Sequence, residues 1–336
     1  MGRVRVLGLL LGAVAAACGP ARAAEGEIAL RAAPVALSET LRDGDRIGSI
    51  RLRGMLELPT LTIGKLQFSQ LSGLAWDDDD GILYAISDKG GLFHLRPEFA
   101  NGMLVGVKLV KAVPLLELKD GKPLKGRRAD SEGLDILNGR NGRRGDAELV
   151  VSFERFPRIV RYRPDGHALG EHPLPEPLND PKAYRDPNQM LEGVCVDPRL
   201  GVLTAPESPL KGETEGMTRI YSLSGKSWLY PLTDGNRISA LECPGDGRVL
   251  VLEREFGRLF GRAVVALKQA QLPPEPSPAE PVAVKTLVSL DAAEGFYIDN
   301  FEGLARHQGD RFFMVSDDND LFFQRTLLLY FEILND

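Results

Sequence analysis

The stretch EGLARHQGDRFFMVSDD, residues 302–318, decides the fold. It starts with a glutamate and a glycine, runs through apolar residues to a turn at Gln308-Gly309-Asp310, and returns as Phe312-Phe313-Met314-Val315 into Ser316-Asp317-Asp318. Two short runs rich in β-forming residues that flank a glycine-containing turn are typical of a β-hairpin. We therefore expect an antiparallel hairpin here.

Four earlier segments follow the same order of start, apolar run, turn and apolar return. They begin at Ser72, Glu132, Glu192 and Ser239, and the one at Ser239 diverges most. A hairpin unit repeated at intervals of roughly 50 residues is typical of a β-propeller, and no long segment shows sustained helical periodicity.

The two ends of the chain offer strands beyond the five repeats. Gly48–Leu58 has the composition of a strand that can pair with the last segment, Arg325–Leu334, which would close the ring and remove exposed edges. We predict an all-β, six-bladed β-propeller whose ring is closed by the N-terminal and C-terminal strands.

The first residues differ from the rest of the chain. Arg3 and Arg5 precede an apolar run from Val6 to Ala17, and Ala21-Arg22-Ala23 has the small-x-small pattern of a signal-peptidase site. We interpret residues 1–23 as a signal peptide and residues 24–336 as a single propeller domain that is periplasmic or secreted. Cys18 leaves a lipoprotein as the less favoured alternative.

Net charge and hydrophobicity limit the kinds of partner that we expect. The formal net charge is −6, and removal of the leader makes it three units more negative because Arg3, Arg5 and Arg22 are lost. That sign disfavours nucleic acid, and no later segment has the roughly 20 uninterrupted apolar residues of a transmembrane span. We expect a monomer that acts on a small-molecule ester or phosphate.

Two cysteines follow the leader, Cys195 and Cys243, so no disulfide framework holds the chain together. The sequence leaves open whether a single disulfide joins them. Counted from the starts of their repeats, they are one residue out of phase, so we expect their side chains to point to opposite faces of neighbouring strands.

The repeats should gather acidic residues at one mouth of the ring. In an antiparallel hairpin, the start of the first strand and the end of the second lie at the same end of the sheet. This places three strand-start glutamates beside the acids that follow the second strands, with further polar residues flanking them. The glutamates are Glu132, Glu192 and Glu302; the acids are Asp88, Glu154, Glu207, Glu253, Glu255, Asp317 and Asp318; Asp130, Asn188, Asp299 and Asn300 flank the mouth.

Crowded carboxylates need cations to offset their repulsion. Oxygen-only ligands favour Ca²⁺ or another hard divalent cation, and the four histidines are scattered without zinc-site spacing. The predicted metal ligands are Glu132, Glu192, Glu302, Asp317, Asp318 and Glu154. Any one of these acids can instead hydrogen-bond backbone amides of a neighbouring blade.

Arginines near the same mouth complete the candidate site. We predict Arg155 and Arg325 to stabilise negative charge in a reaction, with Glu207 as a third catalytic candidate. Ser208 is a weak nucleophile candidate because no histidine accompanies it. Asp77–Asp80 lacks the spacing of a calcium loop and reads as a turn at the opposite mouth.

Several of these segments together resemble the phytase-like family of exported bacterial proteins, also described as having the esterase-like activity of phytase. The segments are Asp299–Leu304, Ser316–Asn319, Gln324–Leu328, Asp130–Leu134 and Pro206–Leu210. The resemblance spans most of the mature chain. It implies a propeller and hydrolysis of phosphate or other esters, assisted by calcium as in the alkaline phytases that bridge substrate phosphate through bound ions.

The function predicted from the sequence is therefore a metal-assisted hydrolase at the acidic mouth. Two alternatives stay open: a non-catalytic periplasmic binding or scaffolding propeller, and a lactonase that resembles the gluconolactonase propellers. Substrate screening separates them.

Overall fold

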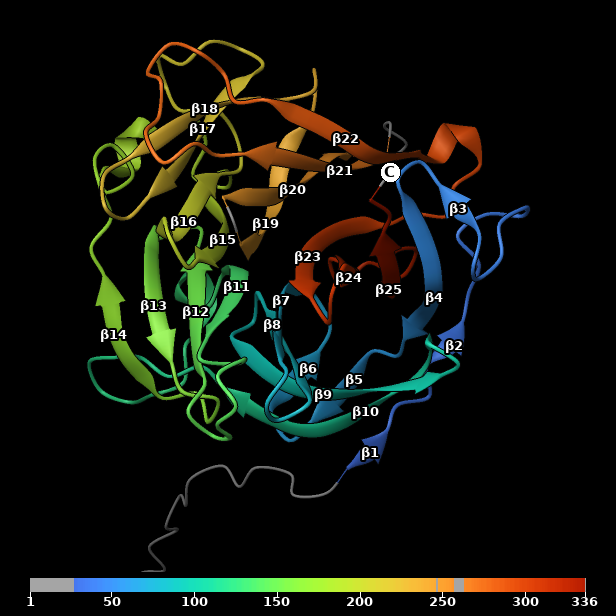
Figure 1. Cartoon of the computed structure of the whole chain (residues 1–336). Helices are drawn as coiled ribbons and strands as arrows, with labels where there is room; N and C mark the ends of the chain where they lie inside the picture. Colours follow the sequence, from blue (N-terminus) through green and yellow to red (C-terminus); the bar gives the residue numbers. More distant parts are fainter. Residues whose placement is uncertain (1–26, 246, 257–262, 336) are drawn as a thin grey trace, which may run out of the picture.

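The repeated hairpins fold into sheets that surround one axis (Figure 1). This computed structural model describes residues 27–335, except residue 246 and residues 257–262. The predicted signal peptide and Cys18 lie outside the described residues. None of the helices in the described part has the length and apolar composition of a membrane span.

Each of the five repeats begins one blade, and the repeat's first strand is the innermost. Blade 1 contains β7 (Leu71–Asp77), β8 (Ile82–Ser87), β9 (Gly91–Ala100) and β10 (Met103–Pro114), with β1 (Ile28–Ala29) at its outer edge. Blade 2 contains β11 (Ser131–Leu137), β12 (Glu148–Phe153), β13 (Arg158–Tyr162) and β14 (Ala168–His172). Blade 3 contains β15 (Leu191–Asp197), β16 (Gly201–Pro206), β17 (Met217–Ser222) and β18 (Ser227–Pro231). Blade 4 contains β19 (Arg237–Gly245), β20 (Arg248–Phe256), β21 (Ala263–Gln271) and β22 (Val284–Asp291).

Blade 5 is built from both ends of the chain. It contains β23 (Asn300–Arg306), β24 (Arg311–Asp317), β25 (Thr326–Ile333) and β4 (Ile50–Leu58), with β2 (Ala33–Pro34) and β3 (Arg46–Ile47) paired to β4. A separate hairpin, β5 (Leu61–Ile63) and β6 (Leu66–Phe68), and three single-turn 3₁₀ helices, η1 (Gly126–Arg128), η2 (Pro181–Ala183) and η3 (Ala292–Glu294), complete the described elements.

The described residues therefore form a five-bladed propeller, and the prediction of six blades is wrong. The predicted closure is confirmed, because β4 pairs antiparallel with β25 and places Leu56 opposite Leu328. The closing strand does not start a blade of its own. The fifth repeat supplies only three strands, so the N-terminal strand is its missing fourth.

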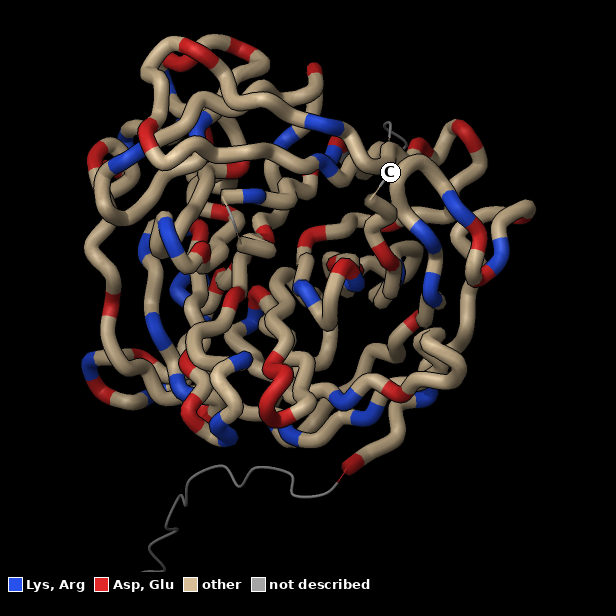
Figure 2. The backbone as a smooth tube through the Cα atoms, viewed as in Figure 1, with Lys and Arg blue, Asp and Glu red and all other residues tan. Residues whose placement is uncertain are grey.

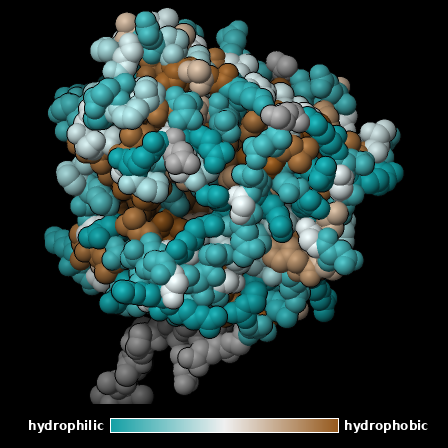
Figure 3. Space-filling model, viewed as in Figure 1, coloured by the Kyte–Doolittle hydropathy of each residue, from teal (hydrophilic) through white to brown (hydrophobic). Residues whose placement is uncertain are grey.

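The blades stack face to face, so inner and middle strands are buried on both sides. Every residue of β7 and β8 is buried, which is why these strands read as apolar runs and not as alternating patterns. Polar side chains cover most of the face drawn in Figure 3, with hydrophobic ones between them.

A ring of glycines lets the inner strands crowd the axis. Cβ atoms added at Gly133 and Gly193 would lie 2.7 Å from the carbonyl oxygen of Glu192 and 2.8 Å from the backbone nitrogen of Leu241. A side chain at either glycine would force the neighbouring backbone to move; only blade 4 has an alanine, Ala240, at this position. The cavity left at this level holds about 10 Å³, room for about one water molecule. The axis is therefore plugged, and the propeller has two separate mouths.

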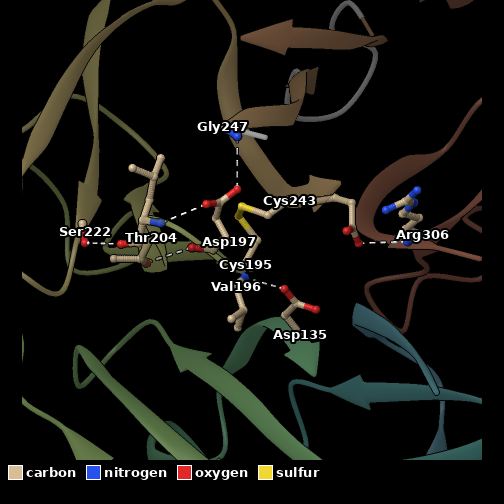
Figure 4. The surroundings of a disulfide bond; sticks show 12 residues. Asp135, Cys195, Val196, Asp197, Thr204, Ser222, Cys243, Gly247 and Arg306 are labelled. Carbon is tan, nitrogen blue, oxygen red and sulfur yellow. Dashed lines mark hydrogen bonds between the residues drawn. A yellow bond between two sulfur atoms is a disulfide. The ribbon is translucent and has the colours of Figure 1, made fainter. Parts of the chain in front are cut away.

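Cys195 and Cys243 form a disulfide between blades 3 and 4, with their Cα atoms 5.5 Å apart (Figure 4). The single bridge that the sequence left open is therefore present, although the two side chains project from opposite faces of their strands. Blades stack, so the forward face of one inner strand meets the rear face of the next. Side chains one residue out of phase in successive repeats therefore face each other.

Candidate functional site at the acidic mouth

A β-bulge aims the strand-start side chains. In all five blades the pairing register between the first two strands shifts at the first residue of the repeat. The shift lies, for example, between Ser131 and Gly133 in blade 2 and between Phe301 and Gly303 in blade 5. A bulge leaves the extra residue out of the ladder and redirects its side chain. Glutamate occupies this position in three blades, and Ser72 and Ser239 occupy it in the other two.

The three bulge glutamates lie buried in the ring, as predicted from the hairpin geometry. Glu132, Glu192 and Glu302 are 9%, 3% and 5% exposed. Figure 2 shows acidic positions near the centre of the ring as well as on the outer loops.

Acids that follow the second strands join these glutamates in two groups. Asp88, Asp130 and Glu132 form the first group, and in each group the carboxylate oxygens lie within 4.8 Å of one another. Glu154, Glu192 and Glu207 form the second. Of these six acids, Glu132, Glu154 and Glu192 were predicted as ligands, whereas Asp88 and Asp130 were predicted only to lie at the mouth and Glu207 was predicted to be catalytic.

Arg254 is the central cation of the mouth. Its Nη2 lies 2.9 Å from Glu302 Oε1, 3.4 Å from Glu207 Oε1 and 3.7 Å from Glu192 Oε1. Its Nη1 donates to Asn300 Oδ1 at 2.7 Å, and Asn300 in turn donates to Glu302. One guanidinium from blade 4 thus ties together carboxylates from blades 3 and 5.

The two arginines predicted to be catalytic occupy different places at the rim. Arg155 Nε donates to Asp130 and lies 3.9 Å from Glu154 Oε2, so it borders both acidic groups. Arg325 Nε donates to Asp299 Oδ2 at 3.1 Å. About a third of each side chain is exposed, which leaves both able to meet a ligand from solvent.

Two predicted mouth acids are occupied by structural contacts. Asp318 accepts hydrogen bonds from the backbone of Gln70 and Asp320 and from the hydroxyl of Thr326. Glu253 is fully buried and pairs with Lys268 Nζ at 2.8 Å. Hydrogen bonding to a neighbouring blade, the alternative role considered for any single acid, describes Asp318.

Ser208 has no base beside it among the described residues. Its hydroxyl donates to Gln189 Oε1 at 3.1 Å, whereas His94 bonds to the carbonyl of Pro164 and His307 to the hydroxyl of Tyr330. A serine–histidine mechanism has no support here.

Comparison with known proteins gives the family. The model of the family described as "Phytase-like: Esterase-like activity of phytase" matches residues 66–320, most of the chain and every blade. This chain belongs to the phytase-like family.

Other comparisons add little to this assignment. No curated protein matches the phytase-like chain. Among solved structures, the Cps50 (Swd1) β-propeller domain of Myceliophteria thermophila aligns at 12% identity over 90% of this chain and 99% of that one, with a TM-score of 0.40. The gluconolactonase XC5397 of Xanthomonas campestris aligns at 12% identity over 93% and 98%, with a TM-score of 0.38. Neither likeness carries an argument about activity.

Burial controls the protonation of the phytase-like mouth. Desolvation raises the pKa of Glu192 well above its usual range, and Glu207 adds to the shift while Arg254 opposes it. Burial likewise raises the pKa of Glu154 to about 8, with Glu207 and Asp130 adding to it. The pKa of Asp88 is raised by burial and then by Asp317. The mouth holds more negative groups than its arginines neutralise, so protons or a cation must make up the difference.

The donors present fit a hard cation. Both groups offer carboxylate oxygens alone, the ligand type that Ca²⁺ and Mg²⁺ prefer. Asp88 Oδ1 is buried and accepts no hydrogen bond from any residue in the described part of the chain. A buried oxygen without a donor is costly unless something positive reaches it.

Proposed function

We propose that this phytase-like chain is an exported, metal-assisted hydrolase of phosphate or other esters that works at the acidic mouth. One observation carries the proposal: two groups of three carboxylates lie side by side in one mouth, with arginines at its rim. The family assignment supports the reaction class.

The acidic groups would hold the cation, and Ca²⁺ is the ion we favour. Asp88, Asp130 and Glu132 form one candidate set, and Glu154, Glu192 and Glu207 the other. Glu302 and Asp317 lie next to them, because both raise the pKa of Asp88 and Glu302 also raises that of Asp317. A hard divalent ion supplies polarisation of an ester or phosphoryl oxygen and a water of lowered pKa.

The remaining side chains bind the substrate and handle protons. Arg155 is partly exposed and borders both groups, so its free N–H donors can hold an anionic oxygen of the substrate. Arg325 can do the same at the Asp299 side of the rim. When the ion lies at Asp88, Asp130 and Glu132, Glu207 is not a ligand; burial raises its pKa, so this carboxyl can then keep a proton and give it to the departing oxygen.

Export rests on two independent features. The leader pattern of residues 1–23 is typical of a secretory signal, and the Cys195–Cys243 disulfide is the kind of bond that persists in oxidising compartments. N-terminal sequencing of the protein recovered from its producing cells should give a mature chain that starts near Ala24. A start at Cys18 would indicate a lipoprotein instead.

A non-catalytic ligand-binding propeller remains the second candidate. Arg254 already neutralises part of the charge on Glu192, Glu207 and Glu302 without any ion. A mouth compensated in this way can bind a cationic or polyhydroxy ligand without performing chemistry.

The test combines metal binding with a substrate panel. Chelator-treated protein is titrated with Ca²⁺ by calorimetry and assayed on p-nitrophenyl phosphate, phytate, p-nitrophenyl acetate and gluconolactone. We expect saturable Ca²⁺ binding and hydrolysis of at least one substrate that EDTA abolishes and Ca²⁺ restores.

Charge-removing variants locate the activity. Glu154→Gln and Glu192→Gln should each lower kcat/KM by about 100-fold or more, because each removes a ligand charge while keeping the side chain's shape. Glu171→Gln changes an exposed acid on the outer strand β14 and should leave the activity intact. A folded, Ca²⁺-loaded protein that turns over no member of the panel would favour the binding role.

A further inference from the structure

The mouth opposite the acidic groups contains a cavity that the proposed reaction does not use. It encloses about 360 Å³, within the range of small-molecule sites. Every blade contributes to it: Trp76, Asp135, Val196, Glu242 and Arg306 come from blades 1 to 5 in order. The glycine plug separates it from the acidic mouth, so it is an independent compartment.

An incompletely bonded acid lies at the wall of this cavity. Glu242 is 7% exposed, and its Oε2 accepts a hydrogen bond from the backbone N–H of Arg306 at 2.9 Å. No residue in the described part of the chain donates to its other oxygen, although Glu242 lines the cavity. A carboxyl oxygen that faces an open space without a protein donor is a hydrogen-bonding position available to a ligand.

Acidic and basic side chains surround Glu242. Asp135 accepts from the backbone of Ile136 and Val196, and Figure 4 shows it beside the disulfide with Arg306 nearby. Arg140 reaches across the mouth and donates to the carbonyl of Arg306 at 2.6 Å, and Arg306 donates to the carbonyl of Pro244 at 2.7 Å. The backbone therefore fixes both guanidinium groups in place.

This mixture selects against ions. A cation would meet Arg140 and Arg306, and an anion would meet Asp135 and Glu242. Burial raises the pKa of Asp135 to about 7 and that of Glu242 to about 8, so near neutral pH either carboxyl can donate as well as accept. A neutral molecule with several hydroxyl groups satisfies donors and acceptors of both kinds.

The rest of the wall mixes apolar and amide side chains. Trp76, Ile136 and Val196 supply apolar surface, while Asn138 and Asn141 supply side-chain amides, each of which also donates to Asp146. A sugar ring has the same two characters, with C–H groups on its faces and hydroxyls at its edge.

We infer that the cavity opposite the acidic mouth is a second ligand site, which binds a neutral polyhydroxy molecule such as a monosaccharide or polyol through Glu242, Asp135 and the Trp76 side of the wall. This site does not depend on the proposed hydrolase activity.

Calorimetric titration or ligand-observed NMR with glucose, galactose, mannitol and myo-inositol tests the inference. We expect at least one probe to bind saturably. Glu242→Gln should weaken that binding by about tenfold or more, because it keeps an oxygen for the Arg306 amide but loses the carboxyl. Ile136→Trp should block binding by filling the cavity, and it keeps the test valid if Glu242→Gln fails to fold.

Matched variants at the other mouth complete the design. Glu192→Gln should leave the affinity for the polyol unchanged, since the plug lies between the two sites. The inference is overturned if no probe binds with a Kd below about 10 mM, or if binding survives both cavity variants or is lost in Glu192→Gln.

Discussion

At the level of single side chains, Arg254 is the residue on which the acidic mouth depends most. Removing it leaves Glu192, Glu207 and Glu302 buried without their shared cation. Breaking a buried ion pair from one side typically costs about 3–5 kcal/mol. We expect Arg254→Met to lower the free energy of unfolding by that amount at pH 8, and by less at pH 5, where the carboxyls can take up protons.

Urea denaturation of both proteins without Ca²⁺ measures the effect. Arg237→Met is the control, because Arg237 is about half exposed and lies 3.7 Å from Glu207 Oε1. Solvent screens an exposed arginine, so its loss should cost much less than that of the buried Arg254, about 1 kcal/mol. Equal losses in the two variants would contradict the central role of Arg254.

The glycine ring makes a second prediction at this scale. A methyl group at Gly133 would collide with backbone atoms of the next blade, 2.7 Å from Glu192 O and 2.8 Å from Val194 N. Gly133→Ala should therefore cost about 1–3 kcal/mol, the range of overpacked cores. At Gly170 on the outer strand β14, an added Cβ meets only Arg161 Nη2 at 3.8 Å.

Thermal unfolding of the two alanine variants compares these positions directly. Gly170→Ala should keep the wild-type Tm or raise it slightly, because alanine reduces the freedom of the unfolded chain. A Gly133→Ala protein as stable as Gly170→Ala would show that the inner strands are not packed so closely.

The sequence predicted single residues well where the repeat was regular and poorly where it was not. Glu132, Glu192 and Glu302 share one bulge position, so their convergence followed from hairpin geometry. Arg254 belongs to the most divergent repeat, and nothing in its neighbours reveals that its guanidinium reaches the axis. Asp317 and Asp318 are adjacent, and only the structure shows that Asp318 bonds to Gln70 and Thr326.

At the scale of strands, one rule links successive blades. The third residue after the bulge position faces the fourth residue after it in the next blade. Asp135 accepts from the amide of Val196, Cys195 bonds to Cys243, and Glu242 accepts from the amide of Arg306. The three junctions from blade 2 to blade 5 are thus joined at one level, two by a hydrogen bond from a backbone amide to a carboxylate and one by a disulfide.

Of these three junctions, the disulfide should contribute most to the free energy of unfolding. The disulfide closes a loop across 48 residues of sequence, for which loss of unfolded-chain entropy gives about 4 kcal/mol. We expect Cys195→Ala/Cys243→Ala to lose about that much stability in urea, and the wild type to lose a similar amount in dithiothreitol.

The double variant is its own control, because dithiothreitol should leave it unchanged. Two free thiols in the native, oxidised protein, measured with a thiol reagent after unfolding, would contradict the bridge. The sequence left this pairing open, because side chains one residue out of phase were expected to point to opposite faces of neighbouring strands. Between stacked sheets, those are the faces that meet.

Strand pairing was predictable and blade number was not. The hairpins and the partnership of Gly48–Leu58 with Arg325–Leu334 follow from alternating runs and turns. Whether the closing strand adds a blade or completes one depends on how many strands the last repeat supplies. No strand follows β25 in the described chain to fill that place, so β4 does.

For the whole molecule, the buried acids predict how stability depends on pH. The folded state raises the pKa of Glu154 from its ordinary 4.5 to about 8. Between these values the folded protein binds more protons than the unfolded one, so the free energy of unfolding falls as pH rises. We expect the Tm of the chelated protein to fall steadily from pH 5 to pH 8, with Asp135 and Glu242 acting in the same direction.

Scanning calorimetry across this range with EDTA and with saturating Ca²⁺ checks the prediction. Bound Ca²⁺ should flatten the dependence, because it replaces the protons that the acidic mouth would otherwise retain. Glu154→Gln should also flatten it in EDTA. A Tm that rises with pH in the chelated protein would mean that the carboxylates are better compensated than the structure indicates.

The plugged axis determines how ligands can enter and leave the molecule. With space for about one water at the level of the glycines, the ring has two mouths, each closed at its inner end, and no open channel between them. A molecule that enters the acidic mouth has to leave through the same opening. In the proposed reaction, product and substrate would therefore use one route, and slow release of product would limit kcat.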